Sequence, residues 1–134
     1  MPSHVFTYGT LMFELVWLKV TVTTFKNAKA QICGFRRTAV KGQVYPALIP
    51  GKENDKVDGI IYFDINDYII RKLDRFEGHA YNRQRVEVDL RDGSKVFAQT
   101  YVLKKAFFSI IEDKIWDQQH FAERYLKDFL DSDI

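Results

Sequence analysis

One helical segment enclosed by strand-like segments constrains the fold of this chain more than any other feature of its sequence. Residues 56–64 alternate in the manner of a strand, whereas hydrophobic side chains in residues 66–76 fall at helical spacing. Residues 83–90 return to strand alternation, and Asp92-Gly93 then predicts a hairpin to a partner strand at 95–103. Helix and hairpin together favour an α+β domain.

The same patterns predict which side chains face the core. The inward-facing residues are expected to be Val57, Ile61, Phe63, Val86, Val88 and Leu90 on the strands, and Ile69, Ile70, Leu73 and Phe76 on the helix. Asn66 or Asp67 is expected to cap the start of that helix, because both side chains can accept a hydrogen bond from the first turn.

Shorter elements are predicted for the rest of the chain. We expect strands at 4–8 and 30–37, and an edge strand or loop-like segment at 43–49 because Pro46 cannot donate to a ladder. A turn is expected at 50–55, a loop or a poorly defined element at 104–114, and a helix at 117–130 with Phe121, Tyr125 and Phe129 on one stripe. Residues 12–25 combine leucines at helical spacing with β-branched side chains, and we favour a helix there. So few helices beside antiparallel strands are compatible with a small barrel, but the pattern fixes neither closure nor strand order.

Length and charge limit the classes of function. The 134 residues fit one domain, spanning 1–134. Because 20 basic residues are balanced by 18 acidic ones, neither a nucleic acid nor a membrane is expected as a partner. No secretory signal or spanning segment is evident, so we expect a cytoplasmic location. The single Cys33 lies in a predicted strand and is expected to be a buried, inert thiol.

The first candidate site is the turn Tyr8-Gly9-Thr10-Leu11, which follows a predicted strand. A glycine that adopts positive φ can point successive backbone N–H groups into one concavity, which would hold a carboxylate or an oxyanion. An ordinary strand-ending turn explains the same residues, and the sequence alone favours that simpler interpretation.

The second candidate is Glu77, which ends the predicted helix and is followed by Gly78 and Tyr81. A carboxylate among apolar neighbours has a raised pKa, as a general acid or base near neutral pH requires. The alternative is a solvated side chain beside an ordinary glycine at the end of a helix. Against that alternative, a glutamate in the last turn opposes the helix dipole.

Other residues admit a structural and a functional interpretation. Tyr45 and Pro46 form either a rigid strand edge or a pocket wall. Arg83 and Arg85 are expected on the strand surface, although the fork of Arg83 could bind a substrate carboxylate. The basic residues Arg36, Arg37 and Lys41 are expected at a solvated strand end rather than on a nucleic-acid face. No phosphate-binding loop, metal-ligand spacing or nucleophile signature is present, so no cofactor or metal is expected.

Taken in order, these segments resemble the gamma-glutamylcyclotransferase-like family, close to its avirulence-induced plant and gamma-glutamylamine cyclotransferase branches. The resemblance is carried by HVFTYGTLM, GQVYPALIPG, KVDGIIYFD, LDRFEGHAYNR, RQRVEVDL, AQTYVL and WDQQHF, and it covers nearly the whole chain. Some branches place a glycine and then an asparagine after the loop, where this chain has FELVWLKV. The resemblance therefore leaves the choice of substrate open.

The resemblance implies a small, mostly antiparallel β-barrel with a few flanking helices and one pocket. It implies that Tyr8, Gly9, Thr10 and Leu11 bind substrate and that Glu77 is the catalytic acid/base. The family's reaction releases 5-oxoproline from a small γ-glutamyl compound without a cofactor, and we expect a monomer. The alternative is a non-catalytic module that binds or senses a small molecule in the same pocket.

Overall fold

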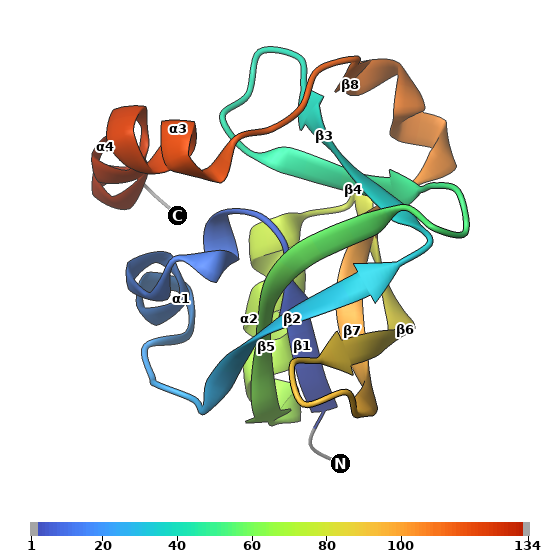
Figure 1. Cartoon of the computed structure of the whole chain (residues 1–134). Coiled ribbons are helices and arrows are strands. Elements are labelled where there is room, and N and C mark those ends of the chain that lie inside the picture. Colours follow the sequence, from blue (N-terminus) through green and yellow to red (C-terminus); the bar gives the residue numbers. More distant parts are fainter. Residues whose placement is uncertain (1–2, 133–134) are drawn as a thin grey trace.

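A five-stranded closed barrel forms the centre of the molecule, in a computed structural model that describes residues 3–132 (Figure 1). Its strands, in barrel order, are β1 (Ser3–Thr7), β5 (Lys56–Ile65), β2 (Asn27–Cys33), β6 (Tyr81–Leu90) and β7 (Lys95–Leu103). Neighbouring strands run antiparallel except where β1 meets β7, a parallel pairing that closes the barrel at Val5 and Gln99. The predicted α+β fold with a mostly antiparallel barrel is confirmed.

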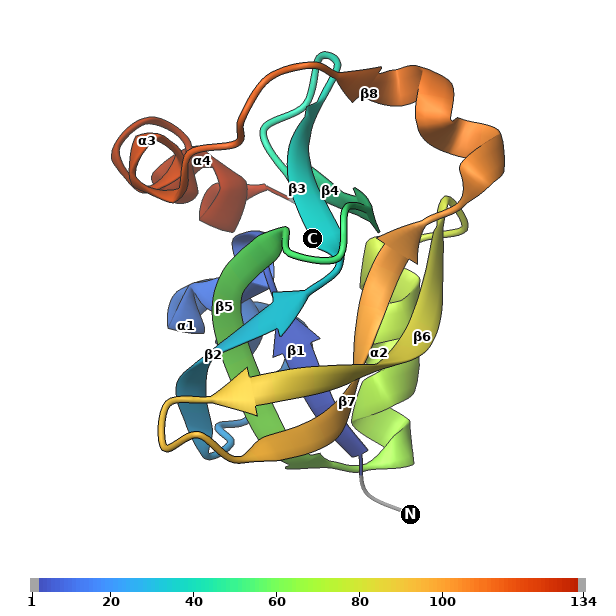
Figure 2. The same ribbon diagram turned by 45° about the vertical axis from the view of Figure 1, so that its right-hand side comes forward.

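A second, smaller sheet lies above the barrel in both ribbon views (Figures 1 and 2). Its strand order is β4 (Pro46–Pro50), β3 (Phe35–Val40) and β8 (Ile111–Glu112). Pro46 is the first residue of β4, and β4 is an edge strand of this sheet, as the missing N–H of proline requires. The predicted edge piece is therefore confirmed, although its strand starts later than expected.

Helices flank both the barrel and the second sheet. They are η1 (Thr10–Met12), α1 (Glu14–Thr21), α2 (Asp67–Glu77), η2 (Lys105–Ile110), α3 (Gln118–Arg124) and α4 (Leu126–Asp131). The side chain of Asn66 accepts a hydrogen bond from the N–H of Ile69 and caps α2, which selects one of the two predicted capping residues. No helix in the described range 3–132 is both long and apolar enough to cross a membrane.

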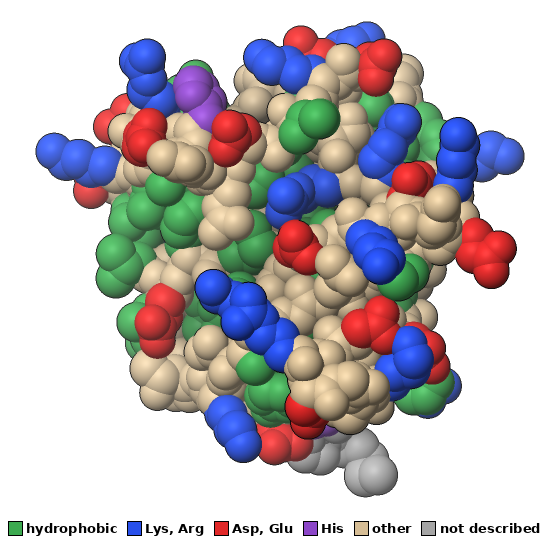
Figure 3. All heavy atoms as spheres, viewed as in Figure 1, with side chains coloured by type: hydrophobic (Ala, Val, Ile, Leu, Met, Phe, Trp, Pro, Cys, Tyr) green, Lys and Arg blue, Asp and Glu red, His purple; other side chains and the backbone are tan. Residues whose placement is uncertain are grey.

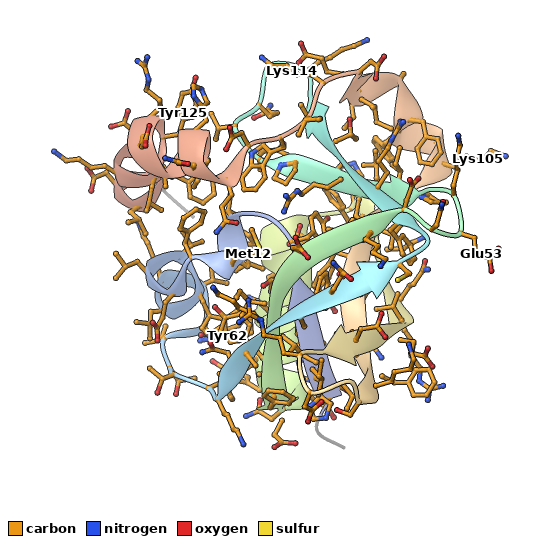
Figure 4. All side chains as sticks on the ribbon, viewed as in Figure 1. Met12, Glu53, Tyr62, Lys105, Lys114 and Tyr125 are labelled. Carbon is orange, nitrogen blue, oxygen red and sulfur yellow. The ribbon has the colours of Figure 1, made fainter. Side chains whose placement is uncertain are left out.

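Two main hydrophobic clusters stabilise this arrangement. One fills the barrel, and includes the predicted inward residues Ile61, Val86 and Val88. The other lies between the barrel wall and helices α1 and α2, where Trp17 stacks on Tyr62 with ring centroids 3.7 Å apart. Figure 4 shows Tyr62 on the side of the barrel that faces α1. Strand β5 therefore buries side chains on both faces, which strict alternation does not predict.

Four predicted elements differ from the structure. The segment 104–114, expected to be a loop or a poorly defined element, contains η2 and the short strand β8. The strand expected at 30–37 is divided between β2 and β3, because Gly34 has φ of 84° and turns the chain there. In the segment 12–25 a helix does form, but it covers only α1 and leaves Leu15 60% exposed. The helix expected at 117–130 is two short helices, α3 and α4, separated at Tyr125 (Figure 4).

The interpretation of Cys33 as a buried thiol was wrong. Cys33 is the last residue of β2 and is exposed, because the alternation of β2 turns its neighbour Ile32 inward instead. Its Sγ lies 3.5 Å from a carboxylate oxygen of Asp89 on β6.

Candidate active site

The two sequence candidates meet at one cavity of about 350 Å³, at the end of the barrel below the second sheet. The loop after β1 forms one side, the end of α2 another, and β4, β6, β7 and α4 complete the wall. The lining residues are Phe6, Thr7, Tyr8, Gly9, Thr10, Leu11, Tyr45, Pro46, Arg75, Phe76, Glu77, Tyr81, Tyr101 and Phe129. Of the sequence candidates, the structure brings together Tyr8–Leu11, Tyr45, Pro46, Glu77 and Tyr81.

Glu77 presents a carboxylate to this cavity without compensation from the protein. It is the last residue of α2, and the positive φ of 85° at Gly78 ends the helix directly after it. Within residues 3–132 its carboxylate makes no hydrogen bond or ion pair, although protein surrounds most of it. Loss of hydration without replacement raises the pKa of Glu77 to about 8. Such a group exchanges protons near neutral pH.

Aromatic side chains surround that carboxylate. Burial first and the charge of Glu77 second raise the pKa of the phenols of Tyr8, Tyr45 and Tyr81, which shows that all three lie close to it. Tyr101 has its pKa raised mainly by burial and by its hydrogen bond to Asp74. The phenols remain neutral at physiological pH, so the wall that they form carries no charge to offset that of the carboxylate.

Most of these phenol hydroxyls donate hydrogen bonds to protein oxygen atoms other than those of Glu77. The hydroxyl of Tyr8 donates to the backbone carbonyl of Tyr101 at 2.7 Å, and that of Tyr81 donates to the carbonyl of Pro46 at 3.3 Å. The hydroxyl of Tyr101 donates to Oδ1 of Asp74 at 2.7 Å. Tyr45 makes no hydrogen bond within the described residues. Its hydroxyl is therefore available to a ligand.

The loop opposite Glu77 is held through its carbonyl groups. The carbonyl of Tyr8 accepts from Arg37 at 2.9 Å, and that of Leu11 accepts from the hydroxyl of Tyr62 at 3.1 Å. The carbonyls of Gly9 and Thr10 accept from the backbone N–H groups of Met12 and Phe13, each three residues later, at 3.0 and 3.1 Å. In contrast, the N–H groups of Gly9, Thr10 and Leu11 have no partner among residues 3–132. Unpaired N–H groups beside a cavity can bind an anion.

Gly9 is required at this loop for a reason that differs from the expected one. Its φ is −130°, so the predicted positive φ was wrong. A Cβ atom built on Gly9 would lie 2.9 Å from both Cδ and Cγ of Pro46, closer than Cβ atoms approach other atoms in proteins. Only glycine lets the loop pack this tightly on the first residue of β4. Two separate sequence motifs therefore meet in one wall of the cavity.

Asp74 fixes the end of α2 to the barrel. It lies one turn before Glu77, accepts the hydroxyl of Tyr101 on β7, and pairs with Nε of Arg83 on β6 at 3.0 Å. Arg83 lies exposed on β6, as expected, outside the cavity wall, and its fork is occupied by Asp74. These contacts do not favour the alternative role in which Arg83 binds a substrate carboxylate. Arg85 stacks instead on the exposed ring of Phe97, at 3.8 Å from the ring centroid.

The basic residues Arg36, Arg37 and Lys41 do not form one surface cluster. Arg37 points toward the barrel, where it donates to the carbonyl of Tyr8 and stacks over Trp116 at 5.2 Å. Arg36 and Lys41 remain exposed at the surface. On the face shown in Figure 3, basic and acidic side chains are interspersed. Arg37 thus supports the cavity loop instead of forming a surface patch.

Sequence reasoning missed several residues of this site. Phe76 was predicted only as a core residue of the helix and Tyr101 only as part of the hairpin strand, and Arg75 was not singled out. Phe129, on α4, enters the cavity wall from the other end of the chain. Arg75 and Phe76 could have been found from their position beside Glu77, but no local signal in the sequence marks Tyr101 or Phe129.

The arrangement can hold an anionic group and move a proton within the same small space. The N–H groups of the loop suit a carboxylate or a developing oxyanion, while Glu77 can accept and return a proton. Within the wall residues there is no serine or cysteine that could act as a nucleophile. The site therefore suits a reaction in which the substrate supplies its own nucleophile.

Comparison with known proteins is consistent with this geometry. The model of the family "Gamma-glutamyl cyclotransferase, AIG2-like" matches residues 5–118. AIG2-like protein D of Arabidopsis thaliana is 37% identical over 128 residues, which are 94% of this chain and 83% of the relative. A solution structure from Arabidopsis thaliana superposes with a TM-score of 0.76 at 25% identity, covering 98% of this chain and 79% of that one. A structure named gamma-glutamyl cyclotransferase has the same fold, with a TM-score of 0.67, 17% identity, and coverage of 78% and 68%.

Proposed function

Because the chain belongs to the gamma-glutamyl cyclotransferase, AIG2-like family, we propose that it releases 5-oxoproline from a γ-glutamyl amine, peptide or related amide. The substrate is a small molecule, the enzyme acts as a monomer, and Glu77 is the general acid/base. The observation that carries this proposal is the carboxylate of Glu77, with a pKa of about 8, at the same cavity that Gly9–Leu11 line. Among residues 3–132, neither this carboxylate nor the N–H groups of Gly9–Leu11 have a hydrogen-bond partner.

The proposed reaction is an intramolecular acyl transfer. The α-amine of the substrate attacks its own γ-carbonyl carbon, and the new C–N bond closes a five-membered ring. The bond from that carbon to the leaving nitrogen then breaks. Neither water nor an enzyme nucleophile takes part, which accounts for a cavity wall without serine or cysteine. Holding the chain of the substrate in a folded, reactive shape contributes roughly 7–11 kcal/mol to lowering the barrier.

Proton transfer is the task of Glu77. The substrate ammonium loses two protons as it becomes the ring N–H, and the leaving nitrogen gains two as it departs as an ammonium ion. Glu77 accepts each proton from the attacking nitrogen and returns it to the leaving nitrogen, so the carboxylate is regenerated. General acid–base catalysis of this kind contributes about 10²–10⁴-fold to the rate.

The loop from Gly9 to Leu11 supplies groups that complement a negative charge on the substrate. Its N–H groups bind either the α-carboxylate of the substrate or the oxyanion of the tetrahedral intermediate, and the loss of one good oxyanion donor costs about 3–4 kcal/mol. The anchoring of four successive carbonyls, from Tyr8 to Leu11, keeps these N–H groups in place before substrate arrives. Such preorganisation lowers the cost of the reaction because the dipoles need not reorient.

Product identity tests the proposal. The protein is incubated with a panel of γ-glutamyl amines, dipeptides and simple amides carrying a ¹⁵N-labelled α-amine, and products are identified by mass spectrometry. We expect 5-oxoproline that retains the ¹⁵N label in its ring. Release of glutamate would mean hydrolysis, and tight binding without any product would mean a non-catalytic ligand-binding module; either result contradicts the proposal.

A further inference from the structure

The C-terminal helix α4 forms part of the cavity although it lies beyond the residues matched by the family model. Figures 1 and 2 both place the α3–α4 pair above α1, on the same side of the barrel.

Lys19 fastens α4 in this position. The ammonium group of this α1 residue donates to the backbone carbonyls of Leu130 and Ser132, the latter at 2.7 Å. These carbonyls stand at the end of α4, where a cation also complements the helix dipole. Leu126 and Leu130 pack on the cluster around Trp17. The hydrogen bonds of Lys19, here called the clamp, and the apolar side chains of Leu126 and Leu130 thus hold α4 against the barrel.

Phe129 is the side chain that α4 contributes to the cavity. Its ring meets Phe76 of α2 edge to face, with centroids 6.4 Å apart, and meets Phe121 of α3 at 5.7 Å. Phe76 directly precedes Glu77, so the apolar wall begins beside the proton-transferring carboxylate. Leu11, at the end of the loop, extends the same hydrophobic cluster.

We propose that Phe129, presented by α4 and backed by Phe76, selects substrates whose leaving group has an apolar body. This inference rests on the proposed function. The glutamyl part of such a substrate is polar at both ends and requires the loop N–H groups and Glu77. The leaving group must therefore occupy the remaining wall, and the part beside Glu77 is the hydrophobic surface of Phe76 and Phe129.

Arg75 borders this apolar wall and makes no hydrogen bond or ion pair within residues 3–132. It is exposed, so water satisfies it in the free protein. A cation at this place disfavours a leaving group whose body carries a further positive charge. A leaving group with an uncharged, apolar body, such as the benzyl group of a γ-glutamyl benzylamide, matches the wall better than a diamine does.

The test compares kcat/KM for γ-glutamyl benzylamide with that for γ-glutamyl methylamide. The wild-type protein should prefer the benzylamide, and Phe129→Ala should reduce that preference roughly tenfold or more, because a hydrophobic pocket distinguishes ligands to about this extent. Phe129→Leu should retain most of it. Lys19→Met, which removes the clamp on α4 at a distance from the cavity, should reduce the preference in the same direction. Phe108→Ala removes a partly exposed ring outside the cavity and should change neither rate.

Failure of the inference and failure of the proposed function give different results. If 5-oxoproline is released but the preference is unchanged in Phe129→Ala and Lys19→Met, the inference is wrong and the proposed function stands. If no substrate is turned over, the proposed function is wrong, and calorimetric binding of the benzylamide decides the inference. Weaker binding to Phe129→Ala than to wild type then supports the apolar wall, whereas equal binding or none overturns it.

Discussion

Replacing Glu77 by glutamine should make the stability of the protein less sensitive to pH. In the folded protein the pKa of Glu77 is raised from 4.5 to about 8, so the native state binds a proton more tightly than the unfolded chain does. The native state is therefore favoured most below pH 4.5, and this contribution is lost as pH rises toward 8. Glutamine is uncharged and shows no such loss.

The magnitude follows from the size of the shift. One pKa unit corresponds to about 1.4 kcal/mol, so the full difference between 4.5 and 8 corresponds to about 5 kcal/mol. The carboxylate opens to the cavity on one side, so solvent screening should make the measured value smaller. We expect Glu77→Gln to gain stability relative to wild type by about 1 kcal/mol per pH unit between pH 5 and 8, and to level off above that range.

Urea denaturation at half-unit steps from pH 5 to 9.5 measures this difference. Glu53→Gln is the matched control, because Glu53 is exposed in the turn before β5, on the side of the molecule away from α1 (Figure 4). Its difference from wild type should stay flat across the range. A flat curve for Glu77→Gln as well would refute the argument that Glu77 is an uncompensated carboxylate.

Three further predictions follow from the contacts of the site. Gly9→Ala places a Cβ atom against Pro46. It should therefore destabilise the protein by about 1–3 kcal/mol in thermal denaturation and lower kcat. Unchanged stability and activity would show that the loop adjusts freely. Tyr101→Phe removes the donor to Asp74, so it should cost about 1 kcal/mol of stability. It should also lower kcat more than it changes KM. Tyr68→Phe, on the exposed face of α2, is the control and should leave both stability and kcat unchanged. Partial loss of hydration, and then Asp89, raise the pKa of Cys33, so iodoacetamide should alkylate it more slowly than free cysteine at pH 7.5 without affecting the cavity. Alkylation as fast as that of free cysteine would contradict this.

Local sequence patterns predicted those parts of the fold that depend on neighbours along the chain. The helix capped by Asn66 and the hairpin at Asp92-Gly93 both follow from residues within a few positions of each other. The division of 30–37 at Gly34 was missed, because a glycine within a strand pattern is also compatible with a continuous strand. The break at Tyr125 was missed because the hydrophobic stripe continues across it.

The site depends more on contacts between distant segments. Glu77 and the loop at Gly9 were identified from their local patterns and the family resemblance, and the structure places both at one cavity. The partner of Gly9 could not be predicted, because Pro46 reaches it only once β4 has joined the second sheet. Arg83 was considered for substrate binding because nothing in its own segment indicates that Asp74, across a turn, occupies it. Phe129 joins the wall from the opposite end of the chain, which local periodicity does not reveal.

The rate of 5-oxoproline release by wild type and Glu77→Gln, measured against pH, tests the central claim most directly. The account predicts a wild-type kcat/KM that rises as pH approaches the pKa of Glu77, about 8, and a fall of about 10²–10⁴-fold in Glu77→Gln with binding largely kept. Glu53→Gln should match wild type throughout. Release of 5-oxoproline by Glu77→Gln at the wild-type rate would contradict the account.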